Sequence, residues 1–217
     1  MLIHLAPSVK NLLIQGIYVI ADNSIVPHKT HLEIAKSSLD AGAKIIQFRA
    51  KNLDRRHFFK TAQSLARICE SYNALLIVND DLEIALEIGA GGVHLGADDL
   101  PIEEAKKQAP NLIIGRSTHS IEEAIIAEKA GADYVAFGAI FPTQTKGRPT
   151  PIQGIEKLKE VCAKVNKPIV AIGGIKRENL PQIRHAGASS AAFISEIVCA
   201  ESISDRVREL IKIWKQS

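Results

Sequence analysis

Eight short apolar runs recur along the chain, and longer segments with helical periodicity separate them. The runs cover residues 16–21, 43–49, 74–79, 91–96, 111–117, 132–138, 167–173 and 190–195. Their hydrophobic residues are continuous instead of alternating with polar ones, which is typical of parallel strands that are covered on both faces. The pattern therefore predicts eight buried parallel strands.

Amphipathic segments between these runs predict helices. The clearest cover residues 31–42, 57–70, 120–132 and about 202–215, each with apolar side chains on one stripe. The third opens with Ser120 and Glu123, at the spacing of a capping box. On the last one, Trp214 falls on the apolar side and is expected in the core.

The stretches DAGAKII, KAGADYV and HAGASSA each join the end of a helix to the next strand, so the chain repeats a βα unit. Eight such units without a Pro- or Ser-rich linker predict an α/β protein with a single (β/α)8 TIM barrel over residues 16–217. Residues 1–15 are expected to form an N-terminal cap or extra helix. A doubly wound open sheet is the alternative, but no GxGxxG follows the first strand.

Composition limits the function classes. Of 217 residues 46% are hydrophobic, and 27 basic against 24 acidic residues leave a net charge of only +3, so neither a nucleic-acid partner nor a membrane is expected. No apolar run reaches the ~20 residues that cross a bilayer. The three cysteines, Cys69, Cys162 and Cys199, are expected as packing residues in a reducing, cytoplasmic compartment. Small-molecule substrates are the expected partners, and a homodimer stays open.

Active sites of such barrels form at the carboxyl ends of the strands. Polar or glycine residues follow seven of the predicted strands in turn: Gln47, Arg49 and Lys51; Asn79 and Asp80; Gly96, Asp98 and Asp99; Ser117, Thr118 and His119; Thr143, Gln144, Thr145 and Lys146; Gly173 and Gly174; Ser195. One such group is ordinary turn chemistry. Together they predict a site at one rim of the barrel.

Two acids on neighbouring strands indicate a metal. Carboxylates of Asp80 and Asp99 that lie close together repel each other, and a hard cation such as Mg2+, which takes one or two carboxylates and otherwise waters and phosphate oxygens, removes that repulsion. The alternative is that these acids are helix N-caps. Asp81, which opens the next helical segment, is expected to be such a cap.

Three stretches suit phosphate oxygens. In QFRAK, Gln47, Arg49 and Lys51 alternate to one face, and an Arg with a Lys forms an anion clamp. TQTK, residues 143–146, offers hydroxyls and an ammonium. IGGI, residues 172–175, lets backbone N–H groups approach a ligand before a helix. A solvated strand end, an ordinary Thr-rich loop and a tight turn are the respective alternatives.

The histidines are less informative. His119 in RSTHS could act as a general acid or base, or it could be a hydrogen-bonding rim residue or a helix-start residue, and the sequence leaves these alternatives open. His94 lies within a predicted strand and is expected as an interior histidine with satisfied hydrogen bonds. No zinc ligand set and no Ser–His–Asp arrangement is indicated.

The stretches QFRAK, IVNDD, GVHLGADD, GRSTHS, ADYVAFGAIFPTQTK, IVAIGGI and GASSAAFIS occur in this order. Together they resemble the thiamine phosphate synthase (thiamine phosphate pyrophosphorylase) family over about residues 16–215. The resemblance implies the coupling of 4-amino-2-methyl-5-(diphosphooxymethyl)pyrimidine with a thiazole ethyl phosphate, or its carboxylated form, to give thiamine phosphate and pyrophosphate by a magnesium-assisted dissociative displacement.

The resemblance also implies residue roles. Those implied for the pyrimidine diphosphate are Gln47, Phe48, Arg49, Ala50, Lys51, Asn79, Ser117 and Lys146. For the thiazole phosphate they are Thr143, Gln144, Thr145, Gly174, Ile194 and Ser195. Asp80 and Asp99 are implied as Mg2+ ligands. Ala50 stands where the family usually has an acid, and the stretch GRPTPIQG after Lys146 differs from many relatives.

Three rival functions remain. A thiazole tautomerase, an isomerase of the same superfamily, would use His119 but typically lacks the complete pair of acids. A non-catalytic ligand-binding relative would be expected to have lost one of Asp80, Asp99, Lys51 or Lys146, and all four are present. A generic sugar-phosphate barrel enzyme fits the phosphate loops but does not require the acids.

Overall fold

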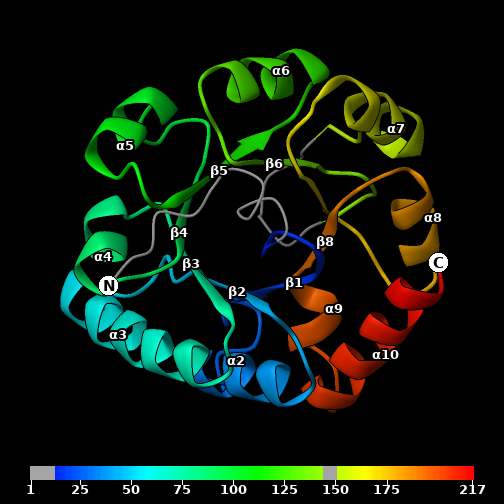
Figure 1. The fold of residues 1–217 in the computed structure, drawn as a ribbon. Helices are drawn as coiled ribbons and strands as arrows, with labels where there is room; N and C mark the ends of the chain where they lie inside the picture. The colour runs from blue at the N-terminus through cyan, green and yellow to red at the C-terminus, as the bar shows by residue number, and fades with distance from the viewer. Residues whose placement is uncertain (1–12, 144–150) are drawn as a thin grey trace.

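The computed structural model describes residues 13–143 and 151–217. Its strands close into one parallel barrel in the order β1-β2-β3-β4-β5-β6-β7-β8, with β8 paired to β1 (Figure 1). The strands are β1 Gly16–Ala21, β2 Ile45–Phe48, β3 Leu75–Asn79, β4 Gly92–Leu95, β5 Ile113–Thr118, β6 Tyr134–Gly138, β7 Ile169–Ile172 and β8 Ser190–Phe193. The predicted TIM barrel is confirmed.

Helices form a ring outside the strands (Figure 1). They are α2 His31–Asp40, α3 Arg55–Ser71, α4 Leu82–Glu87, α5 Ile102–Gln108, α6 Ile121–Lys129, α7 Gly154–Lys164, α8 Leu180–His185, α9 Ser195–Val198 and α10 Ile203–Gln216. The four helices predicted most clearly are all present. The cap expected over residues 1–15 falls mostly outside the described residues.

Helix starts follow side-chain caps. α3 begins two residues earlier than expected because the Asp54 carboxylate accepts from the backbone N–H of His57 at 2.9 Å. Ser120 caps α6 as expected, accepting from the N–H of Glu123 at 3.1 Å. The Glu123 carboxylate accepts from the N–H of His119 at 2.7 Å, so the reciprocal bond of a capping box is shifted by one residue.

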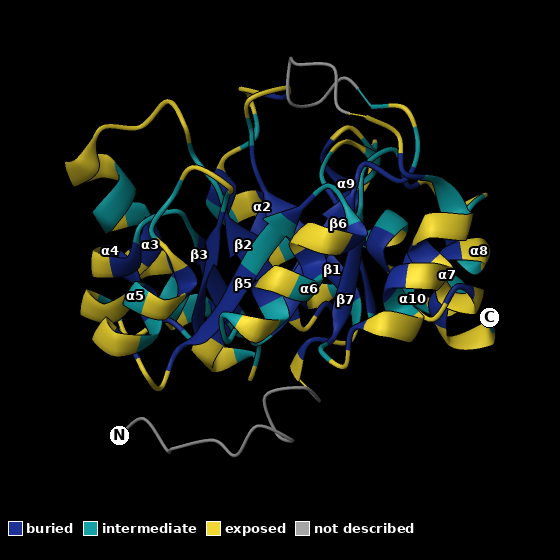
Figure 2. Cartoon of the chain, turned by 90° about the horizontal axis from the view of Figure 1, so that it is seen from above, coloured by how far each residue is buried: buried dark blue, intermediate teal, exposed yellow. Residues whose placement is uncertain are grey.

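Apolar side chains fill two layers, one between the strands and the helices and a second inside the barrel. Buried strands and the half-buried helices around them are visible in Figure 2. Trp214 lies in the outer layer as expected, and so does Cys69. The cysteine expectation is corrected for Cys199, which is exposed, because it follows the short helix α9 at the surface.

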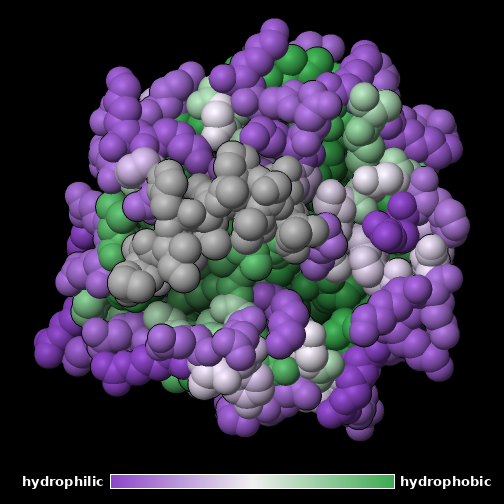
Figure 3. All heavy atoms as spheres, in the orientation of Figure 1, coloured by the Kyte–Doolittle hydropathy of each residue, from purple (hydrophilic) through white to green (hydrophobic). Residues whose placement is uncertain are grey.

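Hydrophilic side chains cover the outer helices on the face drawn in Figure 3. Among residues 13–143 and 151–217, no helix is long and apolar enough to cross a membrane.

Paired strand ends bring distant residues together: Asn79 lies beside His94, and Ser117 beside Ala136. This pairing sets the geometry of the barrel mouth.

Candidate active site

A polar cavity of about 300 Å³ opens at the carboxyl ends of the strands, which is at the lower end of the size of small-molecule sites. Its wall combines predicted site residues from β2 to β5 and the loops after them. These are Gln47, Arg49, Lys51, Asn79, Asp80, Asp99 and Ser117, together with His94 from β4. The structure therefore brings together the acids, the cations and the amides that the sequence placed on separate strand ends.

Asp80 and Asp99 form one acidic pair. Burial raises the pKa of Asp80 most, the nearby Lys51 ammonium lowers it, and the adjacent carboxyl of Asp99 raises it again. Asp99 accepts from the backbone N–H of Gly96 at 2.6 Å. Asp80 has a φ of 68°, a left-handed conformation that is uncommon outside glycine and that collects at functional sites.

The donor set of this pair suits magnesium. In the described part of the chain, no group of three or more His, Cys, Asp or Glu side chains could hold a metal ion, so a zinc-like cage is not formed there. Two adjoining carboxylates beside an open cavity leave positions for water and phosphate oxygens, as Mg2+ prefers. A cation between them would also offset the repulsion that raises the pKa of Asp80.

Replacing Asp99 with Asn should raise the melting temperature at neutral pH. Because the folded-state pKa of Asp80 is raised, the unfolded chain loses this proton first as the pH rises above ~3.9, and stability falls from there to the folded-state pKa. The amide removes one negative charge, while its oxygen can still accept from Gly96. We expect the gain to vanish below about pH 4.

Thermal unfolding from pH 3 to 8, with and without MgCl2, checks this expectation. Mg2+ should raise the melting temperature of the unaltered chain at neutral pH and have much less effect on the variant. A variant that is less stable at neutral pH would instead make Asp99 a structural cap.

The two cations of QFRAK have different partners. Lys51 forms an ion pair with Asp80, and Arg49 forms one with Asp22, a buried acid directly after β1. Phe48 points away from the cavity and packs on Phe58, with ring centroids 4.5 Å apart. Only the backbone of Phe48 is therefore available to a ligand, as the alternation along β2 requires.

A hydrogen-bonded chain crosses the floor of the polar cavity. Gln47 donates from Nε2 to the Tyr18 hydroxyl at 3.0 Å, and the Tyr18 and Tyr134 hydroxyls are 2.8 Å apart. His94 contacts the Tyr134 hydroxyl through Nδ1 at 2.9 Å and Ser117 Oγ through Nε2 at 2.8 Å. His94 is thus an interior histidine with both nitrogens bonded, as expected.

Burial raises the pKa of both tyrosines well above the usual value, so both hydroxyls stay protonated. Room for the Tyr134 ring comes from Gly115, its partner on β5, where a Cβ would lie 2.0 Å from the ring. This chain of hydrogen bonds links Gln47 on β2 with Ser117 on β5, two predicted substrate residues.

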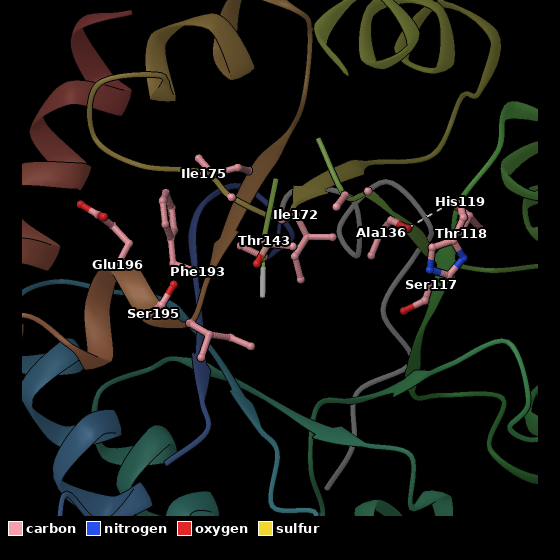
Figure 4. Close-up of a pocket in the computed structure, with 16 residues that line it drawn as sticks. Ser117, Thr118, His119, Ala136, Thr143, Ile172, Ile175, Phe193, Ser195 and Glu196 are labelled. Atoms are coloured by element: carbon pink, nitrogen blue, oxygen red, sulfur yellow. Dashed lines mark hydrogen bonds between the residues drawn. The ribbon is translucent and has the colours of Figure 1, made fainter. Parts of the chain in front are cut away.

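A second cavity adjoins the first and has a mainly apolar wall (Figure 4). The two cavities share Ser117, Ala136, Ile172, Ala192 and Ile194. In Figure 4, Ser117 and His119 lie on one side of the second cavity and Phe193, Ser195 and Glu196 on the other. Thr143, Gly173 and Gly174 also line it. Ser195 begins the short helix α9, whereas the sequence placed it at the end of a strand.

Gly174 follows β7 in close contact with the loop after β6. Its φ is 64°, and a Cβ there would lie 2.5 Å from the carbonyl oxygen of Pro142. Asn179 stabilises the loop after β7: it donates to the Gly174 carbonyl at 3.2 Å and accepts from the N–H of Lys176 at 2.8 Å. Glycine is required here by both the backbone conformation and the space.

His119 lines the second cavity and is partly exposed. Its Nδ1 is 3.5 Å from the Glu123 carboxylate, a distance beyond a good hydrogen bond. Gln144, Thr145 and Lys146, which the sequence also assigns to the site, lie outside the described residues.

Sequence reasoning missed Tyr18, Tyr134 and Asp22. The alternation of GIYVIA places Tyr18 on the same face as Ile20, so an inward tyrosine could have been found from it. Asp22 gave no signal, because its role depends on the pairing of Ala21 with Phe48 across β1 and β2.

Known proteins are similar to this chain over most of its length. The family model described as "Thiamine monophosphate synthase" matches residues 17–197. A thiamine-phosphate synthase of Methanospirillum hungatei is 43% identical over 203 residues, which is 93% of this chain and 98% of that protein. One of Pyrococcus furiosus is 41% identical over 200 residues, 92% of this chain and 95% of that protein.

Solved structures of other proteins have a similar fold. A thiamine phosphate pyrophosphorylase from Pyrococcus furiosus superposes with a TM-score of 0.87 at 38% identity, covering 96% of this chain and 98% of that one. A 3-hexulose-6-phosphate synthase reaches a TM-score of 0.69 at 18% identity, covering 91% and 99%, a likeness of fold alone.

The closed barrel, with acids, cations and glycines gathered at one mouth, defines a TIM-barrel enzyme. More particularly, the chain belongs to the thiamine monophosphate synthase family. It is a transferase of thiamine biosynthesis, as its relatives' shared name of thiamine-phosphate synthase indicates.

Proposed function

We propose that this enzyme couples 4-amino-2-methyl-5-(diphosphooxymethyl)pyrimidine with a thiazole ethyl phosphate, or its carboxylated form, to give thiamine phosphate and pyrophosphate. With the carboxylated form, the carboxyl group leaves as carbon dioxide. The observation that carries this proposal is the pair of adjoining cavities with a common wall at the barrel mouth. Two substrates that react with each other need two such places side by side, and each cavity has the chemistry of one of them.

The polar cavity suits the pyrimidine diphosphate. Arg49 and Lys51 are cations for the diphosphate, and Asp80 and Asp99 are the Mg2+ ligands of the proposal. Gln47, which donates to Tyr18 through Nε2, has an amide oxygen left for the amino group of the ring. Asn79, Ser117, the backbone of Phe48 and Ala50, and Lys146 complete this side by family resemblance.

The second cavity suits the thiazole phosphate. Its wall is largely apolar, as a thiazole ring requires. Loops after β7 and β8, with Gly174, Ile194 and Ser195, occupy the common phosphate position of TIM barrels. Thr143 also lines this cavity, and Gln144 and Thr145 join it by family resemblance. His119 is at its edge, where it can bond to the second substrate or act as an acid or base.

The proposed reaction breaks the bond between the methylene carbon and the diphosphate oxygen, and pyrophosphate leaves with the electron pair. The amino-pyrimidine spreads the positive charge left on the carbon, so a dissociative path is open. The thiazole nitrogen then bonds to that carbon. Arg49, Lys51 and Lys146 stabilise the growing negative charge, and a bound Mg2+ would add charge stabilisation to the same oxygens. No protein nucleophile is needed.

A coupled assay for pyrophosphate release tests this function. Pyrophosphate and thiamine phosphate should form in equal amounts, and only when the pyrimidine diphosphate, the thiazole phosphate and Mg2+ are all present. Product formation that is unchanged by excess chelator would contradict the role of the metal. A parallel tautomerase assay covers the isomerase alternative, and isomerisation without any coupling would replace the proposed reaction.

A further inference from the structure

We propose that Asp22 is a positioning residue that fixes the Arg49 guanidinium for the diphosphate of the first substrate. Asp22 is absent from the wall of the polar cavity, whereas Arg49 is part of it. Asp22 therefore does not contact a ligand there directly, and its ion pair with Arg49 is its link to the cavity. This inference rests on the proposed function of the polar cavity.

Asp22 is held firmly from two directions. It is 2% exposed, its Oδ1 accepts from the backbone N–H of Ser24 at 2.9 Å, and its Oδ2 is paired with Arg49 Nη1. A buried carboxylate needs such compensation, since an unpaired charge away from water is costly. The loop after β1 thus presents a fixed anion to the end of β2.

Arg49 keeps donors for a ligand while it is held. The guanidinium carries five N–H groups in a planar fork, and the pair with Asp22 is made through Nη1. The backbone N–H of Arg49 donates to the Ala21 carbonyl at 3.2 Å, so both ends of the residue are tied to the end of β1. A long side chain held at both ends loses less freedom when it binds an anion.

His31 lies near Asp22 but does not compete with Arg49 as its cationic partner. It is buried edge-on to Phe48, with ring centroids 5.1 Å apart, and its Nε2 has no hydrogen-bond partner in the described residues. Burial lowers the pKa of His31 more than the opposing charge of Asp22 raises it. A neutral His31 leaves Arg49 as the cation that Asp22 holds.

The alternative is that Asp22 only closes the loop after β1. Positioning and loop closure differ in what they do to a ligand. A lost loop contact lowers stability and leaves the anion affinity of the folded enzyme unchanged. A lost positioning contact weakens the binding of pyrophosphate and acts only while Arg49 is present.

Titration calorimetry of inorganic pyrophosphate in the presence of MgCl2 tests the proposal. Asp22→Asn keeps the size and the bond to Ser24 but removes the charge, and we expect it to weaken pyrophosphate binding about tenfold. Arg49→Gln should weaken it more, and Asp22→Asn in that background should add little. Asp133→Asn is the matched control, because Asp133 also forms an ion pair, here with Lys106, but it lies before β6 at the other end of the barrel. It should leave the affinity unchanged.

The proposal is overturned if Asp22→Asn binds pyrophosphate as tightly as the unaltered enzyme or more tightly. It is also overturned if Asp22→Asn weakens pyrophosphate binding by the same factor with Arg49 present and with Arg49 replaced by Gln. Failure of the unaltered enzyme to bind pyrophosphate overturns it too. If Asp22→Asn does not fold, Asp22→Glu, which keeps the charge but moves it, takes its place with the same expected weakening.

In a coupling assay the Asn variant should raise KM for the pyrimidine diphosphate and leave that for the thiazole phosphate unchanged. A coupling assay that fails with the unaltered enzyme contradicts the proposed function alone, and the pyrophosphate titration still decides the role of Asp22.

Discussion

Replacing Asp80 with Asn is expected to slow thiamine phosphate formation at least about 100-fold, the scale on which one electrostatic contact to a transition state acts. The amide removes one of the two charges that would hold Mg2+ against the leaving pyrophosphate. Asn also tolerates the φ of 68° at this position, so the barrel should fold normally. Initial rates at several Mg2+ concentrations, with circular dichroism as the test of folding, check this result.

Asp81→Asn is the matched control for Asp80→Asn. The Asp81 carboxylate caps α4, accepting from the N–H of Ile84 at 2.8 Å, which confirms the sequence prediction for this residue. Asn is also a good N-cap, so activity and stability should change little. Equal losses of activity in both variants would mean that the acids of NDD only stabilise the turn before α4. Full activity of Asp80→Asn would contradict the proposed role of Mg2+.

Replacing Gly174 with Ala is expected to raise KM for the thiazole phosphate at least about tenfold, because a displaced loop would lose the hydrogen bonds to phosphate that the proposed function assigns to it. The new Cβ would lie 2.5 Å from the Pro142 carbonyl oxygen and 2.8 Å from Phe141, so the loops after β6 and β7 must move apart. KM for the pyrimidine diphosphate should change much less, since Gly174 lines only the second cavity.

Gly89→Ala separates backbone strain from displacement of the loop. Gly89 has a similar φ of 68°, but a Cβ there meets nothing within 4 Å. Both variants should lose about 1–2 kcal/mol of stability from the left-handed conformation, and only Gly174→Ala should alter KM. Steady-state kinetics with each substrate varied, alongside thermal unfolding, distinguish the two effects. An equal KM for the thiazole phosphate in the two variants would mean that this substrate does not bind at the Gly174 loop.

The acid pair shows why a site can be less stable than its surroundings. Burial and Asp99 both raise the pKa of Asp80, and Asp80 has a backbone conformation that side chains seldom adopt. Such features persist where the rest of the fold can hold them. In this chain the two apolar layers of the barrel supply that support.

Much of the barrel could be read from the chain, because the period of hydrophobic residues is a local property. All eight predicted strands are present, and their ends are where polar residues follow. The prediction was less accurate at helix boundaries, such as the start of α3, since a single cap residue decides them. Ser195 was placed in a strand because the turn into α9 has no hydrophobic signal of its own.

The sequence by itself determined the eight βα units, the inward and outward faces of the strands, and the side chains available at the carboxyl ends. The closed barrel alone decided which of these side chains meet. Lys51 bonds to Asp80, Arg49 to Asp22, and Tyr18 to Tyr134 across 116 residues of chain. These contacts depend on strand register and barrel closure, which arise from the packing of all strands together and which no local stretch of residues encodes.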